Sequence, residues 1–152
     1  MTESPDQTER PKNVLKMWIR LLATTRTAEN QLREFLRVKH QTTLPRFDVM
    51  AALFRRRDGV TMSELSRMLL VSNGNATAVV DRLEKDGLVK RTTSESDRRT
   101  VFVRLTPAGI RQFETLATDH EREVCALFSG LTDQDLKTVT GIFKRMGKGD
   151  RT

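Results

Sequence analysis

The segment from Thr61 to Thr106 constrains the fold more than any other part of the chain, because helix and strand signals follow each other there at short spacing. Its first four residues, Thr61 to Glu64, have the form of a capping box that starts a helix. A turn rich in serine, asparagine and glycine separates this helix from a second one, which ends at Asp86-Gly87. Two short helices in tandem are therefore expected.

A β-hairpin is predicted directly after these helices. Leu88–Arg91 and Val101–Leu105 alternate apolar and polar residues, as half-buried strands do. The tip between them, residues 92–99, ends in two arginines. The whole pattern is that of a helix-turn-helix followed by a wing. A helix in the major groove together with a basic wing is one way to hold DNA.

The flanking sequences predict long amphipathic helices. Residues 11–40 place apolar side chains every three or four positions, a further helix starts at Leu44-Pro45, and helices follow Thr106-Pro107 and Thr132. Residues 1–10 are polar and are expected to form a disordered tail. The expected fold class is mainly α (α+β), a winged helix-turn-helix core with long N- and C-terminal helices.

These elements predict an organisation in four parts. After the tail at 1–10 come an N-terminal dimerisation and effector helix at 11–40, a winged helix-turn-helix DNA-binding domain at 44–106, and C-terminal dimerisation helices at 107–147. The core is too small to cover all the apolar faces of the long helices, so we expect a two-fold partner to bury the rest. The alternative is a monomer whose terminal helices fold back on the core.

The chain is basic, with a formal net charge of +7. A strongly basic protein can bind nucleic acid, an anionic membrane or an acidic partner. Basic residues outnumber acidic ones within the winged segment, whereas acidic residues dominate between Leu105 and Leu136. The winged segment can therefore face DNA without the acidic stretch.

Several classes of protein lack support in the sequence. No apolar run approaches the roughly 20 residues of a membrane span, and the N-terminus has no signal-peptide core. We therefore expect a cytoplasmic protein with no membrane partner. No nucleophile with a nearby base, carboxylate pair or phosphate loop indicates an enzyme, and no cofactor is expected.

Metal and redox chemistry are also unsupported. The lone Cys125 excludes an internal disulfide and a cysteine-based metal motif. We expect it to be buried as a small apolar residue. His40 and His120 are far apart and show no metal-site spacing, so no metal is expected.

Two segments, Asn75–Val89 and Asp97–Gly109, resemble the MarR family of bacterial transcription regulators in their order and spacing. The flanking helices fit as well, so the resemblance covers nearly the whole chain. It implies double-stranded operator DNA as a partner and a homodimer formed through helices from both ends of the chain. The family pattern Asp-x-Arg further implies that Arg99 enters the minor groove and that Asp97 orients it.

Candidate DNA contacts cluster at the helix starts and the wing. Asn75 and Thr77 suit base contacts in the major groove, whereas Arg82 suits a phosphate unless it pairs with Asp81 or Asp86. Hydroxyls at the start of the first short helix can bind a backbone phosphate. The full candidate set is Thr61, Ser63, Asn73, Gly74, Asn75, Thr77, Ala78, Arg82, Asp97, Arg98 and Arg99.

The resemblance also implies a small, often aromatic, anion bound between the helical dimer lobe and the winged lobe. Candidate lining residues are Trp18, Leu21, Thr25, Phe47, Met50 and Phe54, whose alternative role is core packing. Arg20, Arg26 and Arg33 on the basic first helix are candidate charge partners for a carboxylate or for the phosphates of an acyl-CoA. The run Val71–Thr77 is similar to that of members controlling aromatic-acid catabolism, some of which sense aryl-CoA thioesters.

These observations favour a ligand-responsive transcription regulator. We expect a homodimeric repressor that binds a palindromic operator and is released by a small anionic aromatic effector, such as an aryl-CoA thioester. Two alternatives are a constitutive or architectural DNA-binding protein without an effector, and a redox- or metal-responsive regulator.

Overall fold

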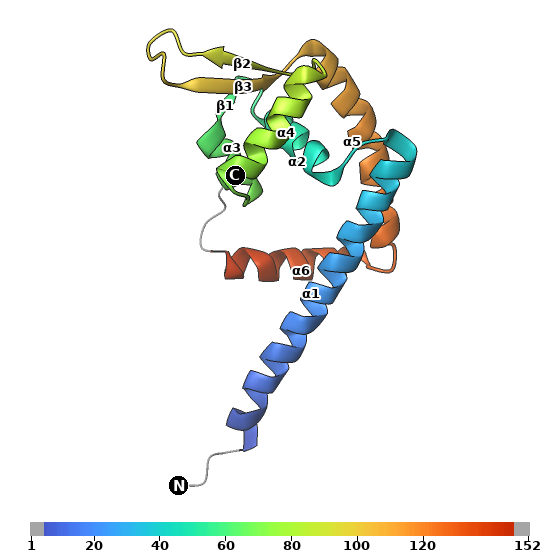
Figure 1. Cartoon of the computed structure of the whole chain (residues 1–152). Coiled ribbons are helices and arrows are strands. Elements are labelled where there is room, and N and C mark those ends of the chain that lie inside the picture. The colour runs from blue at the N-terminus through green and yellow to red at the C-terminus, as the bar shows by residue number, and fades with distance from the viewer. Residues whose placement is uncertain (1–4, 148–152) are drawn as a thin grey trace.

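The computed structural model describes residues 5–147, in which six helices accompany one small antiparallel sheet (Figure 1). The winged core comprises α2 (Leu44–Arg55), β1 (Val60–Thr61), α3 (Met62–Leu69), α4 (Asn73–Lys85), β2 (Val89–Thr93) and β3 (Val101–Leu105). The flanking helices are α1 (Pro5–His40), α5 (Pro107–Leu127) and α6 (Asp133–Met146). The expected mainly α, winged helix-turn-helix fold is confirmed.

Side-chain caps fix where the helices of the core begin. The Thr61 hydroxyl accepts from the Glu64 amide at 3.2 Å, while the Glu64 carboxylate accepts from the Thr61 amide at 3.0 Å. Ser72 caps α4 through the Asn75 amide at 3.2 Å, and Thr106 caps α5. Because each cap satisfies an amide that the helix itself leaves unpaired, these starts follow from local sequence, as predicted.

The sheet differs from the predicted hairpin in two ways. Its order is β1-β3-β2, and the additional strand β1 pairs Val60 with Val103 and Thr61 with Phe102. Strand β2 begins at Val89 and continues to Thr93, two residues beyond the predicted end at Arg91. The two threonines favour extended backbone and gain pairing partners on β3, which the alternation of apolar residues does not reveal.

The first helix starts earlier than expected. The predicted disordered tail at 1–10 is wrong for residues 5–10, which belong to α1, and the rest of that tail lies outside the described residues. A proline at position 5 suits a first helical turn, and helix-forming residues follow it. Helix α2 begins at Leu44, as expected, and ends at Arg55, and Gly59 adopts a positive φ of 105° on the way into β1.

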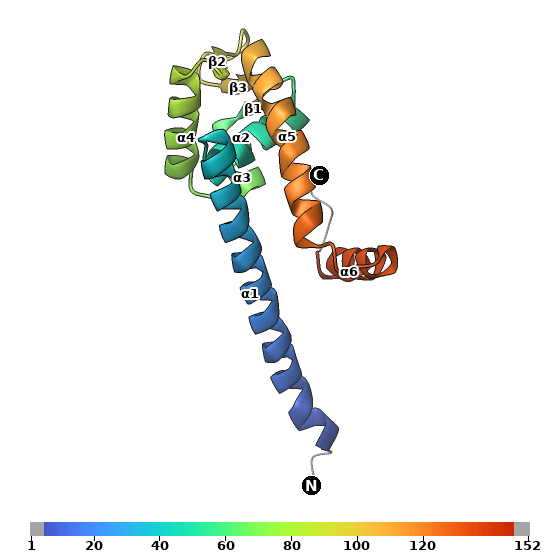
Figure 2. The same ribbon diagram turned by 90° about the vertical axis from the view of Figure 1, so that its right-hand side faces the viewer.

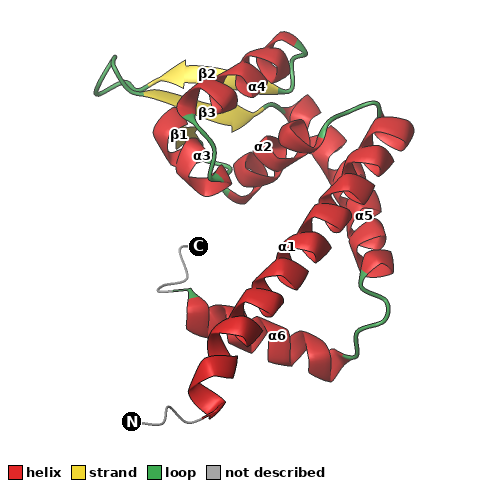
Figure 3. Ribbon diagram, turned by 60° about the horizontal axis from the view of Figure 1, so that its bottom comes forward, coloured by secondary structure: helices red, strands yellow, loops and turns green. Residues whose placement is uncertain are grey.

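The hydrophobic core lies mainly inside the winged segment, and α5 adds Phe113 and Leu116 to it. Its most deeply buried side chains come from every element of that segment and from one end of α1; they include Leu36, Val49, Leu53, Leu65, Val80, Leu83 and Val103. The N-terminal part of α1 runs away from this core, and α6 stands apart from it (Figure 2). Viewed from below, α1 and α5 connect the winged core to that outer region (Figure 3).

Within residues 5–147, no helix combines the length and apolar character that crossing a membrane requires.

Candidate nucleic-acid interface

Helix α4 has one buried face, and its N-terminal end has an exposed polar surface. Ala76, Val80 and Leu83 anchor one face of the helix in the core. The predicted contact residues Asn73, Gly74, Asn75 and Ala78 are exposed, and Thr77 is half-buried. A helix anchored along one side, with small and amide side chains at its free start, has the shape needed to approach base edges in a major groove.

The two residues predicted to contact bases, Thr77 and Asn75, differ in whether their side-chain hydrogen-bonding groups are already used within the chain. The Thr77 hydroxyl donates to the Asn73 carbonyl at 2.7 Å, so its proton is already used inside the helix. No hydrogen bond within residues 5–147 uses the Asn75 side chain. Asn75 therefore keeps the donor and acceptor that a bidentate contact with adenine requires.

Arg82 is free because other arginines take its neighbouring carboxylates. Asp81 binds Arg91, and Asp86 binds Arg46 at 2.8 Å. Arg82 is exposed and makes no ion pair in the part of the chain that the structure describes. The alternative in which it pairs with Asp81 or Asp86 is not adopted, so its charge is available to a phosphate.

At the start of α3, the two predicted hydroxyls have different surroundings. Thr61 is half-buried, and its hydroxyl is committed to the capping box with Glu64. Ser63 is exposed at the first turn of the helix. Ser63 is consequently the more accessible hydroxyl for a backbone phosphate.

The wing tip is ordered by Asp97. One carboxylate oxygen accepts from the Arg99 amide at 3.0 Å, and the other accepts from the Thr100 hydroxyl at 3.1 Å. The side chains of Arg98 and Arg99 are exposed and unpaired within residues 5–147. Asp97 thus shapes the backbone that carries Arg99 and leaves the guanidinium free.

A groove of about 530 Å³ lies between α2, α3 and α5. Its lining residues are Phe47, Asp48, Ala51, Arg55, Met68, Leu69, Phe113, Ala117 and His120. The Phe47 ring stacks on His120 with centroids 4.2 Å apart. Among the predicted effector residues, Phe47 alone lines this groove.

The other predicted effector residues are dispersed in the single chain. Met50 is 1% exposed and belongs to the core, whereas Phe54 packs on Phe113 with Arg57 above its ring. Trp18 is half exposed on the projecting part of α1, which also carries Arg20. Leu21 and Thr25 lie on the same helix, half-buried and exposed respectively. One chain therefore does not gather the α1 and α2 candidates into one site.

Electrostatics connects one of the candidate arginines to the groove. Loss of water around the Asp48 carboxyl raises its pKa, Glu29 raises it further, and Arg33 and Arg55 act in the opposite direction. Arg33 is thereby close enough to influence the groove, and Arg26 and Arg20 lie further along the exposed helix. Burial lowers the pKa of His120.

Sequence reasoning missed Asp48, Arg55, Met68 and Leu69 as groove residues. Their only sequence signal is helical spacing: Asp48 and Arg55 flank the apolar stripe of α2 on the same side. Cys125 was expected to be buried and is exposed, because it lies on α5 beyond Leu116, the last residue of that helix in the core. Within residues 5–147, no three potential ligands gather as a metal site would need.

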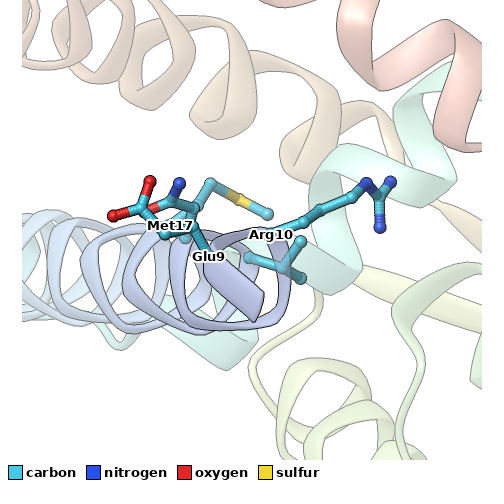
Figure 4. A pocket seen from close by; sticks show the side chains of 5 residues that line it. Glu9, Arg10 and Met17 are labelled. Carbon is cyan, nitrogen blue, oxygen red and sulfur yellow. The ribbon is translucent and has the colours of Figure 1, made fainter. Parts of the chain in front are cut away.

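A second hollow lies on the projecting part of α1 alone, lined by Glu9, Arg10, Asn13, Val14 and Met17. Figure 4 shows the Arg10 guanidinium directed away from the Glu9 carboxylate. These side chains do not converge on a common point, so the hollow has no ligand site built into a single chain.

The sequence and fold match those of known regulators. The signature of the MarR family matches residues 42–101. The chain is 29% identical to the HTH-type transcriptional regulator MhqR of Bacillus subtilis, over 88% of this chain and 90% of that protein. A MarR family transcriptional regulator from Silicibacter pomeroyi is 31% identical, with a TM-score of 0.73 over 95% of this chain and 100% of that one.

A third likeness concerns the fold alone. BpsR of Bordetella bronchiseptica, described with a mechanism for regulation of its DNA binding by 6-hydroxynicotinic acid, is 21% identical. Its TM-score is 0.74, over 86% of this chain and 91% of that one. The tandem helices with an exposed polar start, the arginine-bearing wing and these likenesses agree, and the chain belongs to the MarR family of DNA-binding transcription regulators.

Proposed function

We propose that this chain is a homodimeric repressor, acting in the cytoplasm on a palindromic operator and released from it by a small anionic aromatic effector. The α2–α3–α5 groove carries the ligand part of this proposal, because it combines aromatic walls with a cation at the junction of the winged core and the long helices. Ligand pockets are typically apolar with a few polar groups that fix orientation.

Exposed apolar faces support the homodimer. Trp18 and Ile19 on α1 and Phe143 and Met146 on α6 are each about half exposed in the single chain. None of the α6 residues is buried. Apolar patches of this extent are rare on soluble monomers, and a two-fold partner would cover both helices with one repeated contact. The two copies of α4, the proposed recognition helices, would then reach half-sites roughly 10 base pairs apart.

The groove suggests how the effector is held. An aromatic ring can pack against the wall that Phe47 and Phe113 form together, with their ring centroids 5.5 Å apart, and a ligand carboxylate can pair with Arg55. Asp48 is then left to accept from a ligand hydroxyl. BpsR, which shares this fold, is regulated by a hydroxylated aromatic acid, so the fold is compatible with such control. The partner subunit would bring the α1 candidates other than Arg33 to this site: Trp18, Arg20, Leu21, Thr25 and Arg26.

Release from DNA requires differential affinity. The effector must bind the DNA-incompetent conformation more tightly than the DNA-bound one. Operator DNA must then weaken effector binding by the same factor. Because the groove lies against α3 and α5, a ligand there would change the angle between the winged core and the dimerising helices, and with it the spacing of the two recognition helices.

The test is a gel-shift titration on a duplex selected by the full chain from a random pool. Free hydroxybenzoates, their coenzyme A thioesters and coenzyme A alone are compared. We expect release by an aromatic acid or its thioester, abolished by Arg55→Gln. The matched variant Arg122→Gln, at an exposed arginine of α5 that does not line the groove, should retain release. If no compound changes affinity, the effector proposal fails. Release by the free acid alone would remove the acyl-CoA form of the effector.

A further inference from the structure

Arg91 connects the wing to the recognition helix through three hydrogen bonds. It lies on β2 opposite Val103. Its guanidinium donates to Glu84 at 3.0 Å and to Asp81, and its backbone amide donates to the other Glu84 oxygen at 3.0 Å. Both acceptors belong to α4. We call these contacts the Arg91 bridge.

The bridge makes more contacts than the Arg46–Asp86 ion pair, which also lies at the surface of the core. The Arg91 side chain is 26% exposed, so it lies mostly between the helix and the strand. Its two guanidinium nitrogens reach two carboxylates, a forked geometry that fixes orientation as well as distance. Arg46 and Asp86 form a single contact of 2.8 Å that ties the end of α4 to α2. Of these two links, only the Arg91 bridge reaches the wing.

We propose that Arg91 is a positioning residue for operator recognition, which fixes the angle between the recognition helix and the wing. In the bridged arrangement, Asn75 contacts the major groove while Arg99 contacts the neighbouring minor groove. The bridge also occupies the carboxylate beside Arg82, and so leaves that arginine for a phosphate. The proposal rests on the minor-groove role proposed for Arg99.

Removing the bridge loosens the wing without removing a DNA-contacting group. The β2–β3 pairing keeps the hairpin itself intact, because the five paired residues of each strand do not involve α4. What is lost is the link between hairpin and helix. Arg99 then samples many positions, and its contribution to binding falls because its ordering must be achieved during association.

A double-mutant cycle measures this dependence on the duplex selected by the unaltered chain. Arg99→Ala is made alone and in three backgrounds. Arg91→Met removes the two guanidinium bonds and keeps the amide bond to Glu84, Asp81→Ala/Glu84→Ala removes all three bonds, and Arg46→Met is the control. We expect Arg99→Ala to lower affinity about tenfold in the unaltered and Arg46→Met chains, and less than about threefold in both bridge-deficient chains, since residues that act together are non-additive. Equal loss in all four backgrounds overturns the proposal.

The salt dependence separates positioning from direct contact with DNA. Loss of a phosphate contact reduces the slope of log affinity against log salt by about 0.9. In the Arg99→Ala/Asp81→Ala background, in which no freed Asp81 carboxylate can pair with Arg82, Arg91→Met should leave that slope unchanged. A slope reduced by a full contact would show Arg91 to be a phosphate ligand and would overturn the positioning role.

Hydrogen exchange tests the bridge without DNA. Wing amides at Thr92 and Thr93 should exchange faster in both bridge-deficient chains than in the unaltered and Arg46→Met chains, with α2 amides unchanged as a check on folding. If Arg99→Ala has no effect even in the unaltered chain, the minor-groove proposal fails. The exchange rates of the Thr92 and Thr93 amides are then the only test of the bridge. Faster exchange sustains it, and unchanged exchange overturns it.

Discussion

The winged core and the outer helical parts, the N-terminal half of α1 and all of α6, differ in where their apolar side chains lie. In the core, Leu65 and Val103 are fully buried by neighbours of the same chain. On the outer helices, Trp18 and Phe143 have the same apolar character and are half exposed. The core therefore gains its stability within one chain, whereas the outer helices have amphipathic faces that one chain leaves uncovered.

This difference separates two tasks within one chain. A core that is packed within one chain can hold the recognition helix and the wing at a fixed angle to each other. In the proposed homodimer, the outer helices would set the distance between two such cores, and that distance would determine whether both half-sites are contacted. We make five predictions that test this difference.

The largest expected effect comes from the outer face of α6. Phe143→Glu places a charge on the apolar face and should convert the dimer to a monomer. Operator affinity should fall by roughly 10²- to 10⁴-fold, because the second half-site is no longer tethered. Gln134→Glu adds the same charge nine residues earlier, two and a half turns away on the opposite face, and should have little effect. Sedimentation and gel shifts measure both; a Phe143→Glu chain that stays dimeric contradicts the prediction.

Leucine truncations compare the two regions directly. Leu83→Ala in the fully buried core should lower the free energy of unfolding by about 2–5 kcal/mol, through lost burial and the cavity left behind. Leu136→Ala on exposed α6 should weaken the dimer only. Urea unfolding at several protein concentrations distinguishes them: the loss from Leu83→Ala should not change on dilution, and the loss from Leu136→Ala should vanish. Equal, concentration-independent losses would show that α6 is packed within one chain.

Base reading by the core should be separable from its charge. Asn75→Ala should cost roughly 1–3 kcal/mol on the selected duplex and relax preference at one base pair. Arg82→Ala should weaken binding to all sequences alike and reduce the salt slope by about 0.9. Affinities for a panel of singly substituted duplexes at several salt concentrations provide the measurement. A uniform loss across the panel for Asn75→Ala would remove its reading role.

The sequence predicts what depends on residues close together in the chain. The caps at Thr61, Ser72 and Thr106 are visible because hydroxyl and amide lie three positions apart. By contrast, the two residues of β1 are too few for a periodic pattern, and they form a strand only because β3 lies beside them. Local sequence can predict the first kind of feature and not the second.

The candidate sites divide in the same way. The start of α4 and the wing tip are continuous stretches of chain, and their candidate residues could be chosen from order and spacing. The groove brings Arg55 of α2 together with Leu69 of α3 and His120 of α5. The Arg91 bridge likewise joins a strand to a helix, and no residue-to-residue period predicts it.

The smallest expected effect is a pH dependence at the groove, on the border of the two regions. Burial lowers the pKa of His120 below its ordinary value of 6.5, so the unfolded chain binds this proton more readily than the folded one. Between the lowered pKa and 6.5, stability should therefore rise with pH, and the full contribution is present above that window. His120→Phe keeps a ring against Phe47 and should remove this rise, as measured by urea unfolding at closely spaced pH values.

Asp48 should act with the opposite sign at the same groove. Its pKa is raised above 3.8, so the folded chain binds the proton more readily, and its contribution should decline as pH rises from 3.8 through the raised pKa. Asp48→Asn should remove that decline and leave the His120 window in place. Because both groups face one groove, an effector that fills it should alter both windows at once. If the free energy of unfolding of His120→Phe depends on pH as that of the unaltered chain does, water reaches the His120 ring freely. The groove would then lack the partly desolvated wall that the proposed aromatic ligand needs.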